Sequence, residues 1–281
     1  MCKRLSPLLA LAFLILTFPF WAKGQDTLIK GAIWHDGTIR QGGLIIAQLP
    51  QGSFATLDDI PLAQTENGYI AFGFHRDDEA PARLVITDKD NQLFETMLPP
   101  EKRIYQTQSI TGLASKYVSP PQAVLDRIAS DRDKVAQARA ITSLQDGFAK
   151  SGFNWPLKGR ITGIYGAQRI LNGKPRAPHY GIDIAAPTGT PIYAPASGII
   201  TLVEDLYYTG WTIIIDHGLG ISSTMLHLSH VDVAVGDKVK SGAMIGKVGS
   251  TGRSTGPHLD WRLNWYQKRL DPQLATLTPL P

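Results

Sequence analysis

Apolar and polar residues alternate with a period of two along much of the chain, which predicts strands. Before residue 110, short apolar runs such as GGLIIAQL, GYIAFGF and ARLVITD are separated by Asp, Asn, Gly and Pro turns. After residue 155 the pattern returns in RITGIYG, GIITLVED, WTIIIDHG and HLDWRLNW. We therefore expect an N-terminal β-sandwich-like domain over 25–110 and a C-terminal antiparallel β domain over 155–275.

The segment between the two β regions has helical spacing instead. In SPPQAVLDRIASDRDKVAQARA, Val124, Ile128 and Val135 recur near a helical period, after a serine that can cap and prolines that a first turn tolerates. This pattern predicts a helical connector over 111–154 in an otherwise all-β protein. The glycines of DGFAKSGFNW indicate a hinge, where limited proteolysis would release a C-terminal fragment.

The first residues, MCKRLSPLLALAFLILTFPFWAKGQ, combine a basic start, an apolar run and the small-x-small pattern Ala22-Lys23-Gly24. We expect residues 1–24 to be a signal peptide that is cleaved before Gln25 during secretion. The alternative is a membrane anchor, but the apolar run is short for a span. We therefore expect no stable membrane insertion after cleavage.

Composition and charge exclude several classes of protein. The 43% hydrophobic and 19% charged composition is typical of a globular protein. The formal charge is +4, and removal of Lys3, Arg4 and Lys23 with the signal peptide leaves +1. So small an excess of cations gives no support to nucleic-acid binding. Cys2 is the single cysteine, so the mature chain contains no disulfide and no Cys ligand.

The segment PHYGIDIAAPTGTP places a histidine and an aspartate four residues apart. Pro178 and Pro187 argue against a helix there, and in an extended segment His179 and Asp183 project to the same side. Zinc accepts both an imidazole nitrogen and a carboxylate oxygen, so the pair can form two corners of a metal site. The alternative is a surface histidine beside a turn aspartate.

Two further stretches carry chemistry. MLHLSH places His227 at the end of an apolar strand, where a partly desolvated imidazole can move protons near neutral pH. In PHLDWRLNW, His258 and Asp260 share one face of a strand that follows the Gly/Ser/Thr loop GSTGRSTG. They are either the wet face of that strand or part of a site, and the loop is able to offer backbone donors to a peptide or an oxyanion.

From about residue 159 to 272, HYGIDIAAPTGTPIYAPASGII and IIIDHGLGISSTMLHLSHVDVAVGDKVKSGAMIGKVGSTGRSTGPHLDW resemble the catalytic domain of lysostaphin-type (LytM-domain) zinc metallopeptidases. The family pattern His-x-x-x-Asp implies two zinc ligands, His179 and Asp183. Its His-Leu-Ser motif implies a catalytic histidine at His227. Its final His-x-His motif implies a second catalytic histidine at His258 and the third zinc ligand at position 260.

This chain has Asp260 where the family has its third histidine ligand, and Met225-Leu226 where a tyrosine precedes the His-Leu motif. Aspartate is a competent zinc ligand, so we expect Asp260 to complete the site. Its harder oxygen also admits Mn or Fe in place of Zn. One His and two Asp ligands neutralise a dication, and this count predicts less acidification of water than two His and one Asp.

The resemblance implies a periplasmic metalloendopeptidase that hydrolyses the peptide cross-links of bacterial peptidoglycan by metal-activated water, with stem peptides as its partners. One alternative is a catalytically degenerate LytM-domain protein that binds peptidoglycan or activates another cell-wall hydrolase. A second is a periplasmic adaptor whose N-terminal domain carries the function. The sequence leaves the oligomeric state open.

The other candidate residues receive no committed role. Arg262 shares a face with Asp260, and either pairs with it or meets a substrate carboxylate. We expect His217 to lie in a turn or beside the site and His230 to lie on the surface. His35 and His75 are isolated in the sequence, and we assign them no function.

Overall fold

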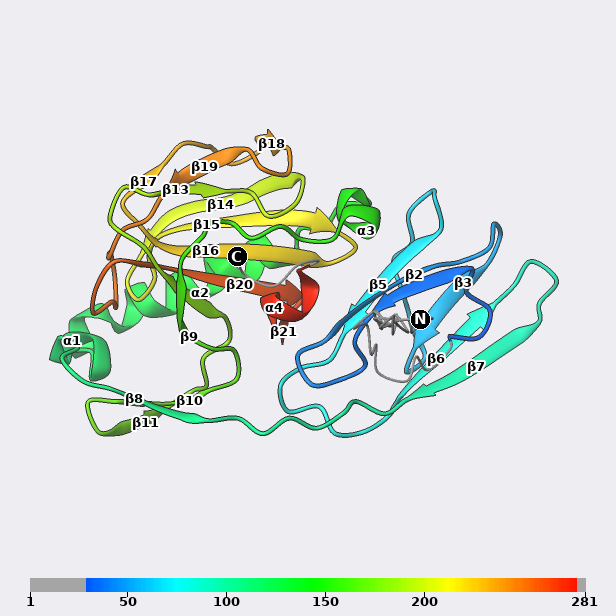
Figure 1. Ribbon diagram of the computed structural model, residues 1–281, viewed down its shortest axis with the longest axis horizontal. Coiled ribbons are helices and arrows are strands. Elements are labelled where there is room, and N and C mark those ends of the chain that lie inside the picture. The colour runs from blue at the N-terminus through cyan, green and yellow to red at the C-terminus, as the bar shows by residue number, and fades with distance from the viewer. Residues whose placement is uncertain (1–28, 277–281) are drawn as a thin grey trace, which may run out of the picture.

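The computed structural model describes residues 29–276 of the chain. Figure 1 shows two β-rich lobes side by side, and the connector between them crosses to the far end of the C-terminal lobe before α2. The all-β fold with a helical connector is therefore confirmed. Among residues 29–276, no helix is long and apolar enough to cross a membrane. The expected signal peptide lies outside the described residues.

The N-terminal lobe is formed by two antiparallel sheets. The first has the order β1-β2-β5, with β1 (Trp34–Gly37), β2 (Leu44–Gln48) and β5 (Tyr69–Gly73). The second has the order β4-β3-β6-β7, with β3 (Phe54–Leu57), β4 (Ile60–Pro61), β6 (Ala82–Thr87) and β7 (Leu93–Leu98). This pair of sheets is the sandwich that the alternating sequence predicts.

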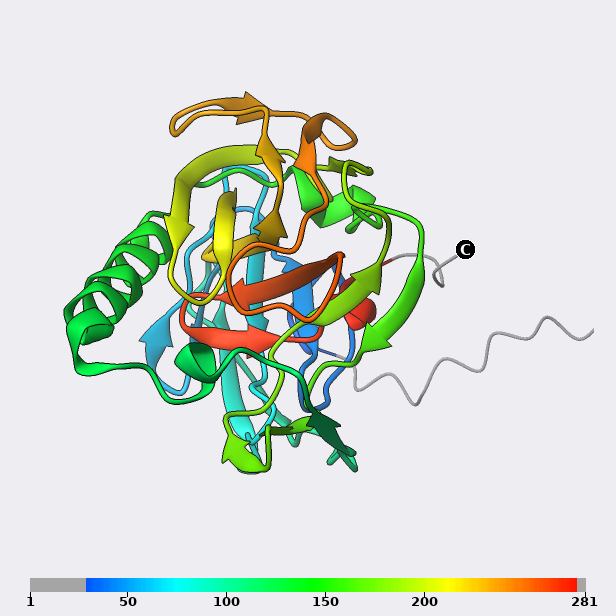
Figure 2. The ribbon, with the colours of Figure 1, turned by 90° about the vertical axis from the view of Figure 1, so that its left-hand side faces the viewer.

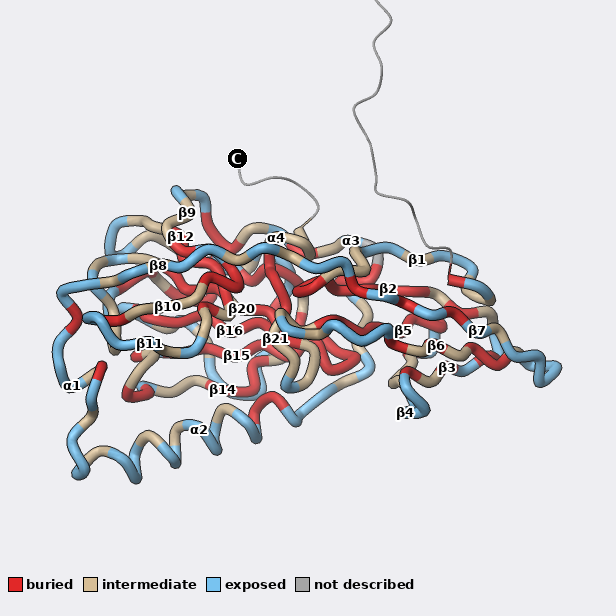
Figure 3. The backbone as a smooth tube through the Cα atoms, turned by 90° about the horizontal axis from the view of Figure 1, so that it is seen from below, coloured by how far each residue is buried: buried red, intermediate tan, exposed pale blue. Residues whose placement is uncertain are grey.

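Strands β2 and β5 of the first sheet are buried on both faces, and Figure 3 shows β2 mostly in the colour of buried residues. Successive side chains of a strand point to opposite faces, so each strand serves two cores. The side chains of one face pack against the second sheet of the lobe: Ile45, Ala47, Ile70 and Phe72. Those of the other face join the core of the C-terminal lobe: Leu44, Ile46, Tyr69 and Ala71. The two lobes therefore have separate cores that meet on opposite faces of β2 and β5.

The C-terminal lobe is built on one large sheet with the order β18-β14-β15-β16-β20-β12-β9, and β21 also pairs with β20. Its strands are β9 (Arg160–Gly163), β12 (Ile182–Ala185), β14 (Gly198–Leu206), β15 (Gly210–Gly218), β16 (Ile221–Leu228), β18 (Lys238–Val239), β20 (His258–Trp265) and β21 (Lys268–Leu270). A smaller sheet has the order β13-β19-β17, with β13 (Pro191–Tyr193), β17 (His230–Val231) and β19 (Met244–Lys247).

A third sheet ties the connector to this lobe. Strand β8 (Thr107–Ile110) runs parallel to β10 (Gln168–Leu171), which pairs with β11 (Lys174–Arg176). The helical elements are α1 (Ser115–Val118), the 3-10 turn η1 (Gln122–Val124), α2 (Leu125–Ala140), α3 (Gly147–Ser151) and α4 (Pro272–Ala275).

Helix α2 covers part of one face of the large sheet and lies along one side of the lobe in Figure 2. Its Ala138 packs with Leu202, Leu206 and Ile214 of β14 and β15. Cross-strand partners lie on the same face of a sheet, and Ile214 is opposite Thr224, which is itself opposite Arg262. Helix α2 packs on β14 and β15, and the polar residue Arg262 of β20 therefore lies on the same face of the sheet, beyond the strands that α2 covers.

The segment that follows α2 is anchored to the core by two aromatic rings, and the cleavage expected there stays a prediction. Phe148 and Phe153 are buried, and their rings stack with centroids 5.6 Å apart. Gly152 has a φ of +59° at the end of α3, a left-handed conformation that glycine adopts without strain. The glycine therefore turns the chain so that both rings enter the core, while Gly147, Ser151 and Asn154 beside them stay exposed.

His217 lies inside β15 in the core and not in a turn. Its Nδ1 is 2.9 Å from the carbonyl oxygen of Ser197, which can only accept, so Nδ1 donates and Nε2 accepts from the Ser223 hydroxyl at 2.9 Å. Trp261 Nε1 also donates to Ser223, at 3.3 Å. Burial lowers the pKa of His217 from 6.5 to about 4.

We expect the free energy of unfolding to fall as the pH drops from 6.5 to 4. The unfolded chain protonates this imidazole below about 6.5, whereas the folded chain does so only near 4, so acid favours the unfolded state. The loss from His217 reaches about 3 kcal/mol. Urea unfolding at several pH values measures it. His217→Gln should flatten this slope, while His230→Gln, at an exposed histidine, should leave it unchanged; an unaltered slope in His217→Gln contradicts the assignment.

Candidate metal centre

His179 and Asp183 lie close together, just before and within strand β12 of the large sheet. His179 precedes β12, and its backbone is fixed by hydrogen bonds from His179 N to Ala167 O at 2.8 Å and from Gly166 N to His179 O at 2.7 Å. Asp183 lies in β12. The distance between His179 Nε2 and Asp183 Oδ1 is 3.1 Å, and both side chains are buried. The pair predicted from the spacing of the sequence therefore forms.

Asp260 faces this pair from the neighbouring strand. Strands β12 and β20 are antiparallel, and their register places Asp183 directly opposite Asp260. Like charges directly opposite each other destabilise a sheet, and here both carboxylates are buried. The pairing therefore requires positive charge close to the two carboxylates.

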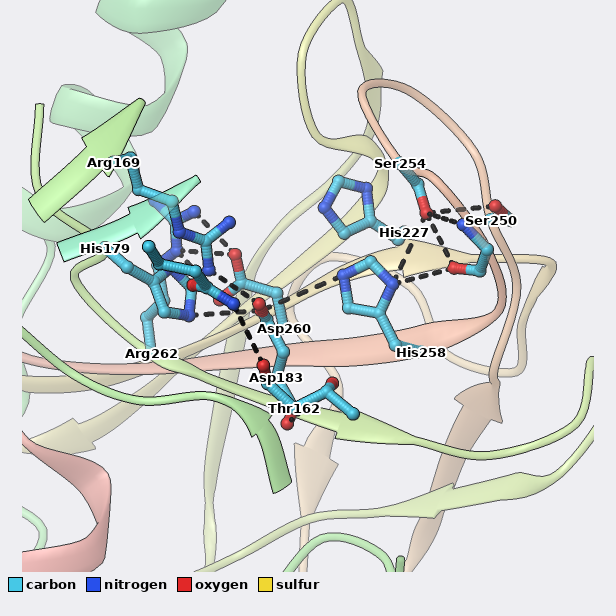
Figure 4. Close-up of polar contacts among 12 residues, drawn as sticks. Thr162, Arg169, His179, Asp183, His227, Ser250, Ser254, His258, Asp260 and Arg262 are labelled. Carbon is cyan, nitrogen blue, oxygen red and sulfur yellow. Dashed lines mark hydrogen bonds and ion pairs between the residues drawn. The ribbon is translucent and has the colours of Figure 1, made fainter. Parts of the chain in front are cut away.

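Two arginines supply part of that charge (Figure 4). Arg169 of β10 donates to Asp183 Oδ2 at 2.7 Å. Arg262 holds Asp260 with two nitrogens, Nε at 3.0 Å from Oδ1 and Nη2 at 2.6 Å from Oδ2. Burial raises the pKa of Asp260, but the charge of Arg262, the charge of His179 and the hydrogen bonds from Arg262 together outweigh it and hold the pKa at about 2. The sequence left open whether Arg262 pairs with Asp260 or meets a substrate carboxylate, and in the structure it pairs with Asp260.

These arginines change the charge count expected from the sequence. The aspartates alone would neutralise a bound dication, whereas the two guanidinium groups restore a net positive charge around it. The expected weaker acidification of water does not follow from this arrangement. The sequence-based count was wrong because it considered only the ligands and left out the cations packed against them.

The residues fit a divalent metal ion. His179, Asp183 and Asp260 each offer one ligand atom, and these atoms lie within 4.8 Å of one another. Within the described part of the chain, His179 Nε2 is buried and has no hydrogen-bond partner, although it faces a carboxylate. One imidazole nitrogen and two carboxylate oxygens suit zinc, and hydrogen bonds from arginine orient carboxylate ligands as outer partners usually do.

His227 lies beside this cluster, at the end of β16. Its φ of +67° is rare for a residue other than glycine and turns the ring out of the strand pattern. Nδ1 is 2.7 Å from the carbonyl oxygen of Thr251, so Nδ1 carries the hydrogen and Nε2 keeps its lone pair. Burial, with the charge of His258 as a smaller cause, lowers the pKa of His227 to about 4. The ring is therefore a neutral proton acceptor at pH 7.

His258 lies at the start of β20 and is oriented in the same way. Its Nδ1 is 2.8 Å from the carbonyl oxygen of Gly256, so Nδ1 carries a hydrogen, and Nε2 lies 3.8 Å from Asp183 Oδ1. The centroids of the His227 and His258 rings are 4.8 Å apart (Figure 4). The Gly/Ser/Thr loop thus orients both rings through carbonyl acceptors, whereas the sequence suggested backbone donors.

All five side chains line one pocket of about 490 Å³. Its walls come from the start of β20, the loop 250–257, β10, β11 and the connector near β8. The rings and carboxylates share one wall, so a peptide in the pocket would meet the proposed ligands and both imidazoles at once.

Residues 177–272 match the sequence profile "Peptidase family M23". This part of the chain is similar to the M23 peptidases. The matched range contains all five candidate site residues, which confirms the resemblance seen in the sequence motifs.

Relatives of the M23 domain include curated enzymes and a solved structure. The chain is 40% identical over 107 residues to "Peptidoglycan DD-endopeptidase ShyA" of Vibrio cholerae, covering 38% of this chain and 25% of that protein. It is 45% identical over 103 residues to "DD-carboxypeptidase/endopeptidase Mpg" of Neisseria meningitidis, covering 37% and 24%. The chain thus spans about a quarter of the length of these relatives.

A putative peptidase M23 from Pseudomonas aeruginosa has a similar structure over most of the chain. The TM-score is 0.62 at 26% identity, covering 84% of this chain and 93% of that chain. The similarity therefore extends well beyond the M23 domain into the N-terminal lobe.

The structure brings together every site residue expected from the sequence and adds one. Arg169 was missed because it stands alone in AQRIL and reaches Asp183 only through the fold. His230 lies on the surface, as expected, with its side chain 59% exposed. His35, His75, His217 and His230 do not line the pocket.

Proposed function

We propose that the chain is a metal-dependent endopeptidase that hydrolyses peptide cross-links of bacterial peptidoglycan in the periplasm, after cleavage of residues 1–24. One observation carries this proposal: three metal-ligand side chains and two imidazoles converge in a single pocket. The names of the curated relatives support peptidoglycan as the substrate. Zinc suits the ligand set best, and Mn or Fe is also compatible with its oxygen atoms.

The residues of the pocket divide the chemistry among them. A divalent ion held by His179, Asp183 and Asp260 would supply Lewis-acid polarisation of the scissile carbonyl and of water. His227 presents a lone pair on Nε2 that can take the proton of the attacking water, and His258, when it carries a proton on Nε2, can donate a hydrogen bond to the charged carbonyl oxygen. The carbonyls of Thr251 and Gly256 fix the tautomers that this requires.

Purified protein starting at Gln25 should contain about one divalent ion per chain and release soluble muropeptides from intact peptidoglycan. Elemental analysis and chromatography of the digest measure the two quantities, and mass spectrometry of the exported protein checks the start at Gln25. Chelation should abolish release, and added zinc should restore it. Metal-loaded protein that leaves peptidoglycan intact would refute the endopeptidase proposal.

A second candidate function is supported by the two arginines. Arg169 and Arg262 already neutralise the two buried aspartates, so the site can be electrostatically balanced without a dication. We propose as the alternative a catalytically silent domain that binds peptidoglycan or activates another cell-wall hydrolase. This alternative predicts protein that sediments with peptidoglycan, contains no stoichiometric metal and releases no muropeptides.

A further inference from the structure

Two more arginines converge at one end of the pocket. Arg176 of β11 donates from Nη2 to the carbonyl oxygen of Val118 at 2.6 Å. Arg253, in the loop 250–257, reaches the carbonyl oxygen of Tyr117 from Nη1 at 3.5 Å. These carbonyls belong to adjacent residues at the end of α1, so the two guanidinium groups lie side by side although their residues are far apart in the sequence.

These two guanidinium groups differ from the other pair in the pocket. Arg169 and Arg262 each hold an aspartate, whereas within residues 29–276 neither Arg176 nor Arg253 makes an ion pair with a carboxylate. Their acceptors from the chain are backbone carbonyls, and Arg253 also lies over the ring of Tyr208, with its Cζ 4.7 Å from the centroid. Most of their N–H donors therefore remain available.

The charge of the pocket is unbalanced as a result. Its lining contains four arginines and two aspartates, which leaves an excess of two positive charges before any metal binds. Burial lowers the pKa of Arg253, and repulsion from Arg262, Arg169 and Arg176 lowers it further. The surplus cations are thus close enough to repel one another, and an anion between them would relieve this repulsion.

We propose that Arg176 and Arg253 form a carboxylate-binding subsite, so that the substrate is a peptide with a free carboxylate near the scissile bond. This inference rests on the proposed function for the statement that the ligand is a peptide. A guanidinium group has five N–H donors in a planar fork that matches the two oxygens of a carboxylate. The subsite selects anionic peptides and disfavours neutral ones of the same length.

The test compares N-acetyl-D-alanyl-D-alanine with its C-terminal amide, two probes that differ only in the charged end. Metal is first removed with EDTA and the chelator is dialysed away; binding is then measured by NMR titration at low salt, so that neither metal nor chelator competes for the carboxylate and no turnover occurs. We expect the acid to bind about 10-fold or more tightly than the amide, since a hydrogen bond to a charged group contributes about 1.5–3 kcal/mol.

Substitutions then test which arginines cause the tighter binding of the acid. Arg253→Gln and Arg176→Gln should each reduce the acid-to-amide ratio toward one, and Arg253→Lys should retain part of it through its charge. Arg160→Gln changes an exposed arginine outside the pocket and should leave the ratio unchanged. If the arginines merely anchor α1, the same variants lower the melting temperature and leave the ratio intact.

Equal binding of the two probes to the wild type, or no binding of the acid at millimolar concentration, overturns the subsite. A preference that survives both glutamine variants overturns it as well. Failure of the proposed function is a separate result, because the binding assay requires neither metal nor hydrolysis. A protein that never cuts peptidoglycan can still show the preference for the acid.

Discussion

Asp260→Ala should lose the divalent metal and, with it, all hydrolysis of peptidoglycan. His179 and Asp183 would remain, and two protein ligands hold a dication poorly. Elemental analysis should show metal falling from about one ion per chain to near zero. The variant also leaves the Arg262 guanidinium buried without its carboxylate, at a cost of about 3–5 kcal/mol in stability.

Arg262→Gln is the matched control, because it breaks the same ion pair and leaves the ligand in place. It should be destabilised to a similar degree and still bind metal, with equal or higher affinity since a neighbouring cation is removed. Metal loss in both variants would mean that Asp260 acts through the fold and is not a ligand.

Restoring an imidazole at position 260 should require two changes. Asp260→His alone leaves the buried Arg262 beside a dication and without a partner. A metal-bound histidine usually donates its other N–H to a carboxylate, so Asp260→His with Arg262→Glu should hold the metal at least as tightly as the wild type. A competitive chelator titration of the single and double variants compares their affinities.

His258→Ala should keep the metal and lose hydrolysis by about 10²–10⁴-fold, the usual effect of removing a general acid or base. His258 Nε2 lies 3.8 Å from Asp183 Oδ1, and its ring lies next to that of His227, so His258 borders the cluster and is not one of its three proposed ligands. Metal content and the rate of muropeptide release measure the two effects separately.

The control for His258 is His230→Ala, at a largely exposed histidine outside the pocket, which should change neither quantity. The competing assignment makes His258 the third ligand and Asp260 only its orienting partner. It predicts the reverse pattern: His258→Ala loses the metal, and Asp260→Ala weakens its binding by about 10–100-fold. Metal stoichiometry of the two alanine variants decides between the assignments.

The sequence was sufficient to predict the residues of the site, because each motif is local. His179 and Asp183 are four apart, His258 and Asp260 are two apart, and their relation within a strand follows from its period. The sequence did not predict how the motifs are placed relative to one another in space. The pairing of Asp183 with Asp260 depends on the register of β12 and β20, and Arg169 reaches Asp183 from a different sheet.

The same holds for the fold: local patterns predicted the secondary structure, whereas the packing of distant segments was not predicted. Alternation predicted the strands and the sandwich, and helical spacing predicted α2. The burial of Phe148 and Phe153 was not predicted, because glycines near both rings are typical of a hinge and only the completed core shows where the rings lie. The packing of β2 and β5 between the two cores also depends on contacts that no single segment encodes.

Strands β2 and β5, with one face in each core, limit how this protein can be divided or recombined. A catalytic fragment cut after the connector would expose to water the apolar surface that Leu44, Ile46, Tyr69 and Ala71 now cover. Such a fragment invites aggregation during expression. A chimera that carries the N-terminal lobe of a relative would need complementary side chains at this boundary, so the two lobes are expected to change together during evolution.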